Sequence, residues 1–240
     1  MKIKQLFTLS AALLMAFCAY AQDIPTINPT ASYINKDGME EEGTIFSGSA
    51  PLQFHFKANA ENTFGYSVTY EWHFTLQGEE KPYLVRYEED TDYTFSKAGT
   101  HLIELYATFI QGNDTVAYTQ YYWEQEATPL RITISESRLE MPNAFSPNGD
   151  GYNDIYQAKK NYQSLTEFHA YIFNRWGQKL YEWSDPAGGW DGTFNGKEVK
   201  DGVYFVLVKA KGADGREYNI RRDVNLLRGF TETTGQSSGY

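Results

Sequence analysis

Cysteine is almost absent from this chain of 240 residues, since Cys18 is the only one, and no internal disulfide can form. Basic residues are also scarce, with 21 Lys and Arg against 31 Asp and Glu and a formal net charge of −10. This balance excludes nucleic acid as the expected partner, because phosphate binding requires a basic surface. After residue 21, no apolar stretch is long enough to cross a bilayer as a helix.

Recognisable catalytic motifs are lacking as well. The chain has four histidines, none of them in an H-E-x-x-H motif or at metal-ligand spacing, and no G-x-S-x-G elbow. They are His55, His73, His101 and His169. We therefore expect no enzyme. A small hydrolase stays open as an alternative, because the carboxylate pair of a glycosidase is defined by its separation in space and not by a sequence motif.

The amino end has the features of a secretory signal peptide. Lys2 and Lys4 form a basic start, residues 6–19 are apolar apart from Thr8 and Ser10, and residues 19–21 read AYA. These features predict a signal peptide at residues 1–21, export by the Sec route, and a mature chain that begins at Gln22.

Two alternatives exist for this segment. A transmembrane anchor would need a longer apolar run. A lipoprotein would use Cys18, but acylation favours a small residue before the cysteine, and Phe17 is bulky.

Charge divides the rest of the chain near Met141. Residues 22–140 hold 7 basic and 19 acidic residues, a net charge of −12, whereas residues 141–240 hold 12 of each. This asymmetry indicates two units with separate surfaces, joined at about residues 135–142. The acidic clusters at 40–42 and 88–90 are expected to be solvated loops.

The first unit alternates apolar and polar residues as strands do. At 52–58 and at 66–76, every second residue is apolar, and Trp72 lies on the apolar face of the second segment. Glycine-containing turns separate these strands from further candidates at 83–87, 93–95, 101–110, 116–123 and 130–134. Short strands at this spacing predict an antiparallel β-sandwich, with Trp72 in its core.

Four short motifs occur in this unit: SAPL at 49–52, YEWHF at 70–74, YTF at 93–95 and GTH at 99–101. Together they resemble a PKD domain. The resemblance implies an immunoglobulin-like module at 22–140, typical of extracellular proteins. The Trp-Asp-Phe-Gly-Asp-Gly run of that family is replaced here by WHFTLQG at 72–78.

The second unit also reads as strands and turns. Residues 168–173 and 179–183 form a predicted hairpin around Asn174-Arg175-Trp176-Gly177. Residues 202–212 are apolar on both faces, which predicts a central strand, and 217–227 form the last strand. One short helical turn is possible at 157–166. The predicted fold class is therefore all-β, with two antiparallel sandwiches in tandem.

Five motifs follow one another in this unit: PNAFSPNGDGYND at 142–154, IFNRWG at 172–177, GWDG at 189–192, KDGVY at 200–204 and VNLLR at 224–228. In this order they resemble the gliding motility-associated C-terminal domain, also called the type B sorting domain of the type IX secretion system. The match covers about residues 141–228, and the domain is expected at 141–230. It implies a β-sandwich that the secretion machinery at the outer membrane recognises after Sec export.

The resemblance therefore implies a non-catalytic secreted or cell-surface protein, with the first unit as a spacer or binding module. A surface adhesin or glycan-binding module that does not depend on type IX secretion is the alternative. The polar tail at 231–240 extends beyond the last family motif, and would obstruct recognition of a buried carboxyl terminus.

The turn at 146–154 suggests a second alternative, a calcium loop. Ser146, Asn148, Asp150 and Asp154 would occupy positions 1, 3, 5 and 9 of an oxygen-ligand loop, with Gly151 at position 6. Serine replaces the usual first aspartate, and Gln157 replaces the bidentate glutamate. Asn and Asp are also common in plain turns, so no cofactor is the main expectation.

Cationic and aromatic side chains supply the remaining site candidates. Arg175 and Arg228, with Arg221 and Arg222, are hypothesised to form one docking face for the secretion machinery, and ordinary solvated surface charge is the alternative. Trp190 is expected to pack at the sandwich edge, with a sugar-stacking platform as its alternative.

Overall fold

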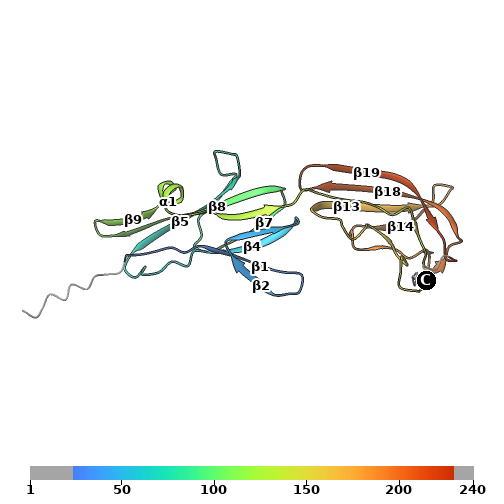
Figure 1. Cartoon of the computed structure of the whole chain (residues 1–240), viewed down its shortest axis with the longest axis horizontal. Coiled ribbons are helices and arrows are strands. Elements are labelled where there is room, and N and C mark those ends of the chain that lie inside the picture. Colours follow the sequence, from blue (N-terminus) through green and yellow to red (C-terminus); the bar gives the residue numbers. More distant parts are fainter. Residues whose placement is uncertain (1–23, 230–240) are drawn as a thin grey trace, which may run out of the picture.

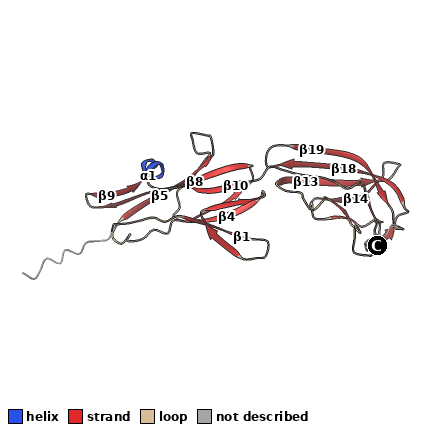
Figure 2. Cartoon of the chain, in the orientation of Figure 1, coloured by secondary structure: helices blue, strands red, loops and turns tan. Residues whose placement is uncertain are grey.

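The computed structural model describes residues 24–229, so the predicted signal peptide and polar tail lie outside the described residues. Two strand-built domains lie end to end along the long axis of the molecule (Figure 1). Strands dominate both, and a single short helix occurs within 24–229 (Figure 2). The predicted all-β fold class is confirmed. No helix in this described part has the length and apolar content of a membrane span.

The first domain is a sandwich of two sheets. The first sheet has the order β2-β1-β4-β7, and the second has the order β3-β10-β8-β5-β6, with β9 paired to β8. The strands are β1 Thr30–Ile34, β2 Glu40–Gly43, β3 Ile45–Gly48, β4 Leu52–Lys57, β5 Ser67–Leu76, β6 Leu84–Arg86, β7 Thr91–Phe95, β8 Gly99–Gln111, β9 Asp114–Tyr118 and β10 Leu130–Ile134.

Aromatic side chains from both sheets fill the first core. Phe56 of β4 packs against Trp72 and Phe74 of β5, Phe54 packs against Phe56, and all four are fully buried. The indole Nε1 of Trp72 donates to the carbonyls of Glu88 and Glu89 at 3.1 Å, so the buried polar atom is satisfied. Trp72 is therefore a core residue, as its alternation predicts.

Three features of this domain differ from the sequence prediction. Residues 116–123 were expected as one strand, but β9 ends at Tyr118 and helix α1 spans Gln120–Gln125. The helical turn brings Trp123 inward, where its Nε1 donates to the carbonyl of Leu105 at 3.0 Å. The acidic cluster at 40–42 is edge strand β2 rather than a loop, and β3 pairs in parallel with β10.

The second domain is built on one five-stranded sheet of order β11-β19-β18-β13-β14, with β11 parallel to β19. Its strands are β11 Ala144–Phe145, β13 Leu165–Phe173, β14 Lys179–Trp183, β18 Gly202–Gly212 and β19 Glu217–Leu226. Two small sheets cover its inner face, formed by β12 Tyr156–Gln157 with β15 Gly189–Trp190 and by β16 Thr193–Phe194 with β17 Lys197–Glu198. Residues 157–166 hold a hydrogen-bonded turn, not a helix.

The second core lies on the inner face only. Trp190 and Tyr156 are fully buried there, beside Phe145. Strand β18 is central, as predicted, but it is not buried on both faces, because Val203 and Phe205 are 50% and 46% exposed. Nothing in residues 24–229 covers the outer face of the sheet at these two positions.

Hydrogen bonds join the two domains. The hydroxyl of Ser164 accepts from the amide of Ala50 at 3.2 Å and lies 2.8 Å from the hydroxyl of Ser135. Ala213, in the turn after β18, packs into the first core. Its neighbour Asp214 accepts from the hydroxyl of Ser137 at 2.7 Å.

Candidate functional site

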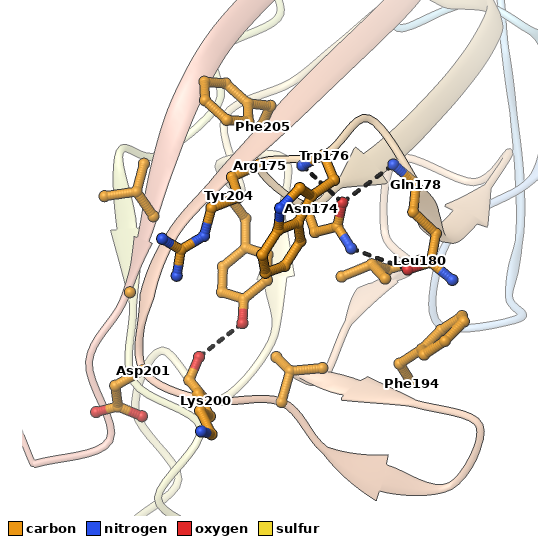
Figure 3. A pocket seen from close by; sticks show the side chains of 13 residues that line it. Asn174, Arg175, Trp176, Gln178, Leu180, Phe194, Lys200, Asp201, Tyr204 and Phe205 are labelled. Atoms are coloured by element: carbon orange, nitrogen blue, oxygen red, sulfur yellow. Dashed lines mark hydrogen bonds between the residues drawn. The ribbon is translucent and has the colours of Figure 1, made fainter.

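A cleft of about 490 Å³ opens on the second domain (Figure 3). The turn between β13 and β14, the loop between β17 and β18, and the first residues of β18 form most of it, and one residue each of β14 and β16 completes it. Its lining residues are Asn174, Arg175, Trp176, Gln178, Leu180, Phe194, Val199, Lys200, Asp201, Gly202, Val203, Tyr204 and Phe205. Apolar walls with a few charged groups are typical of a binding site.

The turn between β13 and β14 is held rigid by Asn174. Its Oδ1 accepts from the amides of Trp176 and Gln178, each at 3.0 Å, and its Nδ2 donates to Gln178 Oε1 at 2.9 Å. Gly177 has a φ of +79°, a conformation that glycine adopts without strain. The sequence around Asn174 therefore presents the two side chains between these anchors in a fixed position.

Those two side chains are Arg175 and Trp176. Trp176 is 78% exposed, and the guanidinium carbon of Arg175 lies 4.9 Å from the centre of its ring. Within residues 24–229, Arg175 makes no hydrogen bond or ion pair. Stacking leaves the N–H groups of a guanidinium free for a carboxylate, and exposed tryptophan beside arginine is typical of interface hot spots.

Tyr204 forms the floor of the cleft. Its ring is buried, and its hydroxyl donates to the carbonyl of Lys200 at 2.6 Å (Figure 3). Burial raises the pKa of this hydroxyl, so Tyr204 stays protonated and acts as a hydrogen-bond donor. The bond fixes the 199–201 loop against β18.

Arg228 also holds the 199–201 loop in place. Its Nη1 donates to the carbonyl of Val199 at 2.6 Å and lies 3.1 Å from Asp201 Oδ1, while its Nη2 donates to the carbonyl of Gly192 at 3.0 Å. The side chain is 18% exposed. Its contacts are therefore those of a residue that positions the cleft.

The four arginines hypothesised to share one face do not do so. Arg175 lies on the hairpin turn, and Arg228 is tucked under the 199–201 loop. Arg221 lies on the outer face of the sheet, whereas Arg222 donates to the carbonyl of Met141 at 2.9 Å. Neighbouring positions on a strand point to opposite faces, which separates Arg221 from Arg222.

The candidate calcium loop is organised by Asp154. Its Oδ1 accepts from the amides of Asn148 and Gly149 at 2.9 and 2.7 Å, and its Oδ2 from that of Gly151 at 2.8 Å. These bonds, led by that from Gly149, lower the pKa of the carboxyl. Asp150 Oδ1 accepts from the amide of Tyr152 at 2.8 Å.

Ser146 is buried, and its hydroxyl lies 3.5 Å from the carbonyl of Tyr152. The loop thus has the geometry of linked Asx turns. Calcium binding stays an alternative to the plain turn.

The other candidates fall outside the cleft. Trp190 is buried and donates to the carbonyl of Thr193 at 2.7 Å, so the sugar-platform alternative is wrong and the packing role is confirmed. His55 pairs with Asp92 in one sheet and His73 with Glu71 in the other. No group of three metal-ligating side chains occurs within residues 24–229.

Sequence reasoning identified Arg175 but not its neighbour Trp176 or the floor residue Tyr204. The Asn-x-x-Gly turn around Arg175 was a usable signal, because an apolar side chain at the tip of a two-strand turn has no core to enter. Tyr204 gave no signal of its own, since its partner is a backbone carbonyl.

The comparisons with known proteins locate a family at the second domain. Residues 139–220 match the family described as the CHU_C type IX secretion signal domain. None of the curated proteins matches the chain.

Two solved structures share parts of its shape. Dimeric latent PorU from Porphyromonas gingivalis has 12% identity and a TM-score of 0.26, over 85% of this chain and 20% of that one. Bacteroides ovatus SGBP-B, solved with a mixed-linkage heptasaccharide, has 14% identity and a TM-score of 0.27, over 85% of this chain and 48% of that one. This chain thus spans a fifth and about half of their lengths, and neither likeness bears on its function.

A type IX secretion signal domain implies export to the cell surface or the extracellular space, and contact with the type IX machinery. Four of the five motifs, at 142–154, 172–177, 189–192 and 200–204, lie within this match, and the fifth, at 224–228, lies just beyond it. Residues 139–220 are therefore a CHU_C type IX secretion signal domain, and this chain is a protein that carries one.

Proposed function

We propose that this protein is a non-catalytic surface or extracellular protein, and that its second domain is the address by which the type IX machinery delivers it. Export would begin by the Sec route, with residues 1–21 as the signal peptide that is removed. The observation that carries the proposal is the family match at residues 139–220.

The cleft at Arg175 and Trp176 is the proposed point of recognition. A partner that inserts a carboxylate beside an apolar side chain would pair with Arg175 and cover Trp176. Neither group has another role within residues 24–229, whereas Arg228 acts on recognition through the loop that it holds.

The first domain, which we propose to be PKD-like, serves as a spacer or as the module that binds a surface protein or glycan. Its net charge of −12 is unlike that of the second domain, so its surface is suited to a different partner. A surface adhesin or glycan binder that reaches the surface by another route remains the second candidate. A glycan array with the purified protein tests the binding role.

The delivery role is tested by deleting residues 141–240 and treating intact cells with protease. Loss of surface or secreted protein, with accumulation in the periplasm, is expected. Normal surface exposure of the truncated chain would favour the second candidate.

A sharper test changes only the cleft. Trp176→Ala and Arg175→Ala are each expected to lower delivery. The thermal unfolding temperature of the purified protein is expected to stay the same, because both side chains are exposed. Phe64→Ala is the matched control, since Phe64 is 94% exposed in the first domain. Equal delivery of all three variants would remove the cleft from the proposal and leave the address role to the rest of the domain.

A further inference from the structure

The uncovered outer face of the five-stranded sheet carries two ordered rows of side chains. The register of β14, β13, β18 and β19 aligns them across the sheet. One row is Lys179, Phe173, Phe205 and Asp223, and the other is Glu182, Tyr171, Leu207 and Arg221. The rows are two residues apart along β13, β18 and β19, which is roughly 7 Å, and three residues apart along β14, where the register shifts at a bulge.

The middle of both rows is apolar. Phe205 is 46% exposed and Val203, further along β18, is 50% exposed, while Phe173, Tyr171 and Leu207 are half-buried. A shallow depression of about 460 Å³ lies over Phe205 and Leu207. A contiguous apolar patch of this kind on a soluble domain indicates an interaction surface.

The ends of both rows are charged, and the signs alternate. Lys179 and Asp223 end one row, and Glu182 and Arg221 end the other. All four side chains are exposed. The apolar centre therefore has a charged rim, as interfaces do, and opposite charges face each other along each edge as well as across the sheet.

This alternation is complementary to itself. Two copies can pack face to face about a two-fold axis that lies in the plane of the contact. An axis that runs across the strands exchanges the two rows, and an axis that runs along the strands exchanges the two edges. Both arrangements place each lysine or arginine over a carboxylate of the second copy. The rim thus fits another copy of the same face better than it fits a surface of one charge sign.

We propose that this outer face is a homodimer interface, in which two copies of the chain pack their sheets face to face. Lys179 and Glu182 already form an ion pair at 2.6 Å within one copy, so the gain on association comes from the apolar centre and from Arg221 and Asp223. The contact is small, and a reversible dimer is expected. This inference is independent of the proposed delivery role.

Sedimentation of the purified protein over a concentration series tests the dimer. The native protein is expected to self-associate, and Phe205→Asp to weaken association by about tenfold or more, because a carboxylate is then buried without a partner. Phe64→Asp, which adds the same charge to an exposed site of the first domain, is expected to change nothing. A native protein that stays monomeric up to about 1 mM, the weak limit of specific association, overturns the proposal.

Charge exchange gives a second test that does not touch the apolar centre. Arg221→Glu is expected to weaken association, because like charges then meet in either two-fold arrangement. Adding Asp223→Arg restores the pairing if the axis runs across the strands, and adding Glu182→Arg restores it if the axis runs along them. Rescue by one of the two double variants supports the dimer, and rescue by neither overturns it.

The secretion machinery is the competing occupant of this face. If Phe205→Asp leaves self-association unchanged, the dimer is wrong, and any loss of delivery is then assigned to the cleft, which Phe205 also lines. Circular dichroism and thermal unfolding confirm that each variant is folded. Should Phe205→Asp fail to fold, the charge-exchange series decides alone, since its residues are exposed.

Discussion

The amide of Ala98 in the first domain donates to the carbonyl of Ala213 in the second at 2.9 Å, and the amide of Ala213 donates to the carbonyl of Ser164 at 2.9 Å. The turn after β18 is therefore hydrogen-bonded to both domains. Because Ala213 is also buried in the first core, this turn aligns the two domains end to end.

Gly212, which precedes this turn, leaves no room for a side chain. A Cβ at this position would collide with the side chains of Ser137 and Asp214, which hydrogen-bond each other at the joint. Gly212→Ala is expected to cost about 1–3 kcal/mol of unfolding free energy, as overpacking does. Urea denaturation measures the loss. Gly229→Ala, where a Cβ meets nothing within 4 Å, is the control, and equal stability of the two variants would contradict the prediction.

Arg228 is predicted to stabilise the cleft. Arg228→Ala removes the hydrogen bonds to Gly192 and Val199 and the ion pair with Asp201, and is expected to cost about 2–4 kcal/mol. Arg228→Lys keeps the charge but loses the fork of donors, so we expect an intermediate loss. Denaturant unfolding of the three proteins gives the order. Unchanged stability of Arg228→Ala would contradict this prediction, and Arg228 would again be a candidate for direct contact with the secretion machinery.

His101 is predicted to make the first domain sensitive to acid. It is buried, its Nε2 donates to the carbonyl of Lys97 at 2.9 Å, and its Nδ1 lies 2.9 Å from the hydroxyl of Tyr83. Burial lowers the pKa of the imidazole, so the neutral ring is favoured. The contribution of the neutral His101 ring to the free energy of unfolding is complete above the ordinary pKa of about 6.5. It is lost as pH falls through the lower pKa that His101 has in the folded protein.

Unfolding free energy measured across this pH range tests the role of His101. His101→Gln is expected to flatten the profile. The control is His169→Gln, which changes an exposed histidine on β13 and is expected to keep the native profile. Parallel profiles for the native protein and His101→Gln would exclude the buried imidazole as the cause.

Asp154 is predicted to order the 146–154 loop as an ionised carboxylate. Hydrogen bonds from backbone amides lower the pKa of Asp154. The loop is therefore expected to be fully ordered above the ordinary pKa of 3.8, and to lose this order as pH falls through the lower pKa that Asp154 has in the folded protein. Hydrogen exchange at the amides of Gly149 and Gly151 measures this. Asp154→Asn is expected to speed exchange at both amides at neutral pH. Added calcium is expected to leave it unchanged, because both oxygens already accept from amides, and slower exchange with calcium would restore the metal-loop alternative.

Much of the strand content could be predicted from the sequence. Alternation placed Trp72 and its neighbours in β5, and the turn residues placed the hairpin around Arg175. In the second domain the two-residue strands β11, β12 and β15 to β17 were missed. In the first domain the strands missed, β1 to β3, are short and carry polar or acidic residues. Their pairing depends on β4 and β10, which lie elsewhere in the sequence.

The site could be predicted only in part. Arg175 and Arg228 were both identified as cations near family motifs, but their environments differ. One stacks on an exposed indole, and the other is enclosed by backbone carbonyls of two loops. A single sequence does not distinguish these, because the carbonyls that enclose Arg228 come from residues 29 and 36 positions away.

The sequence by itself determined the all-β class and the alternation of side chains along each strand, because the two-residue period of a strand is a local property of the backbone. Only the tertiary structure decided which of the two faces of a strand is covered. Val206 and Phe205 are adjacent and both apolar, yet one is buried and the other exposed. The difference arises because the small sheets β12-β15 and β16-β17 pack on one side of β18, and within residues 24–229 no second layer reaches the other.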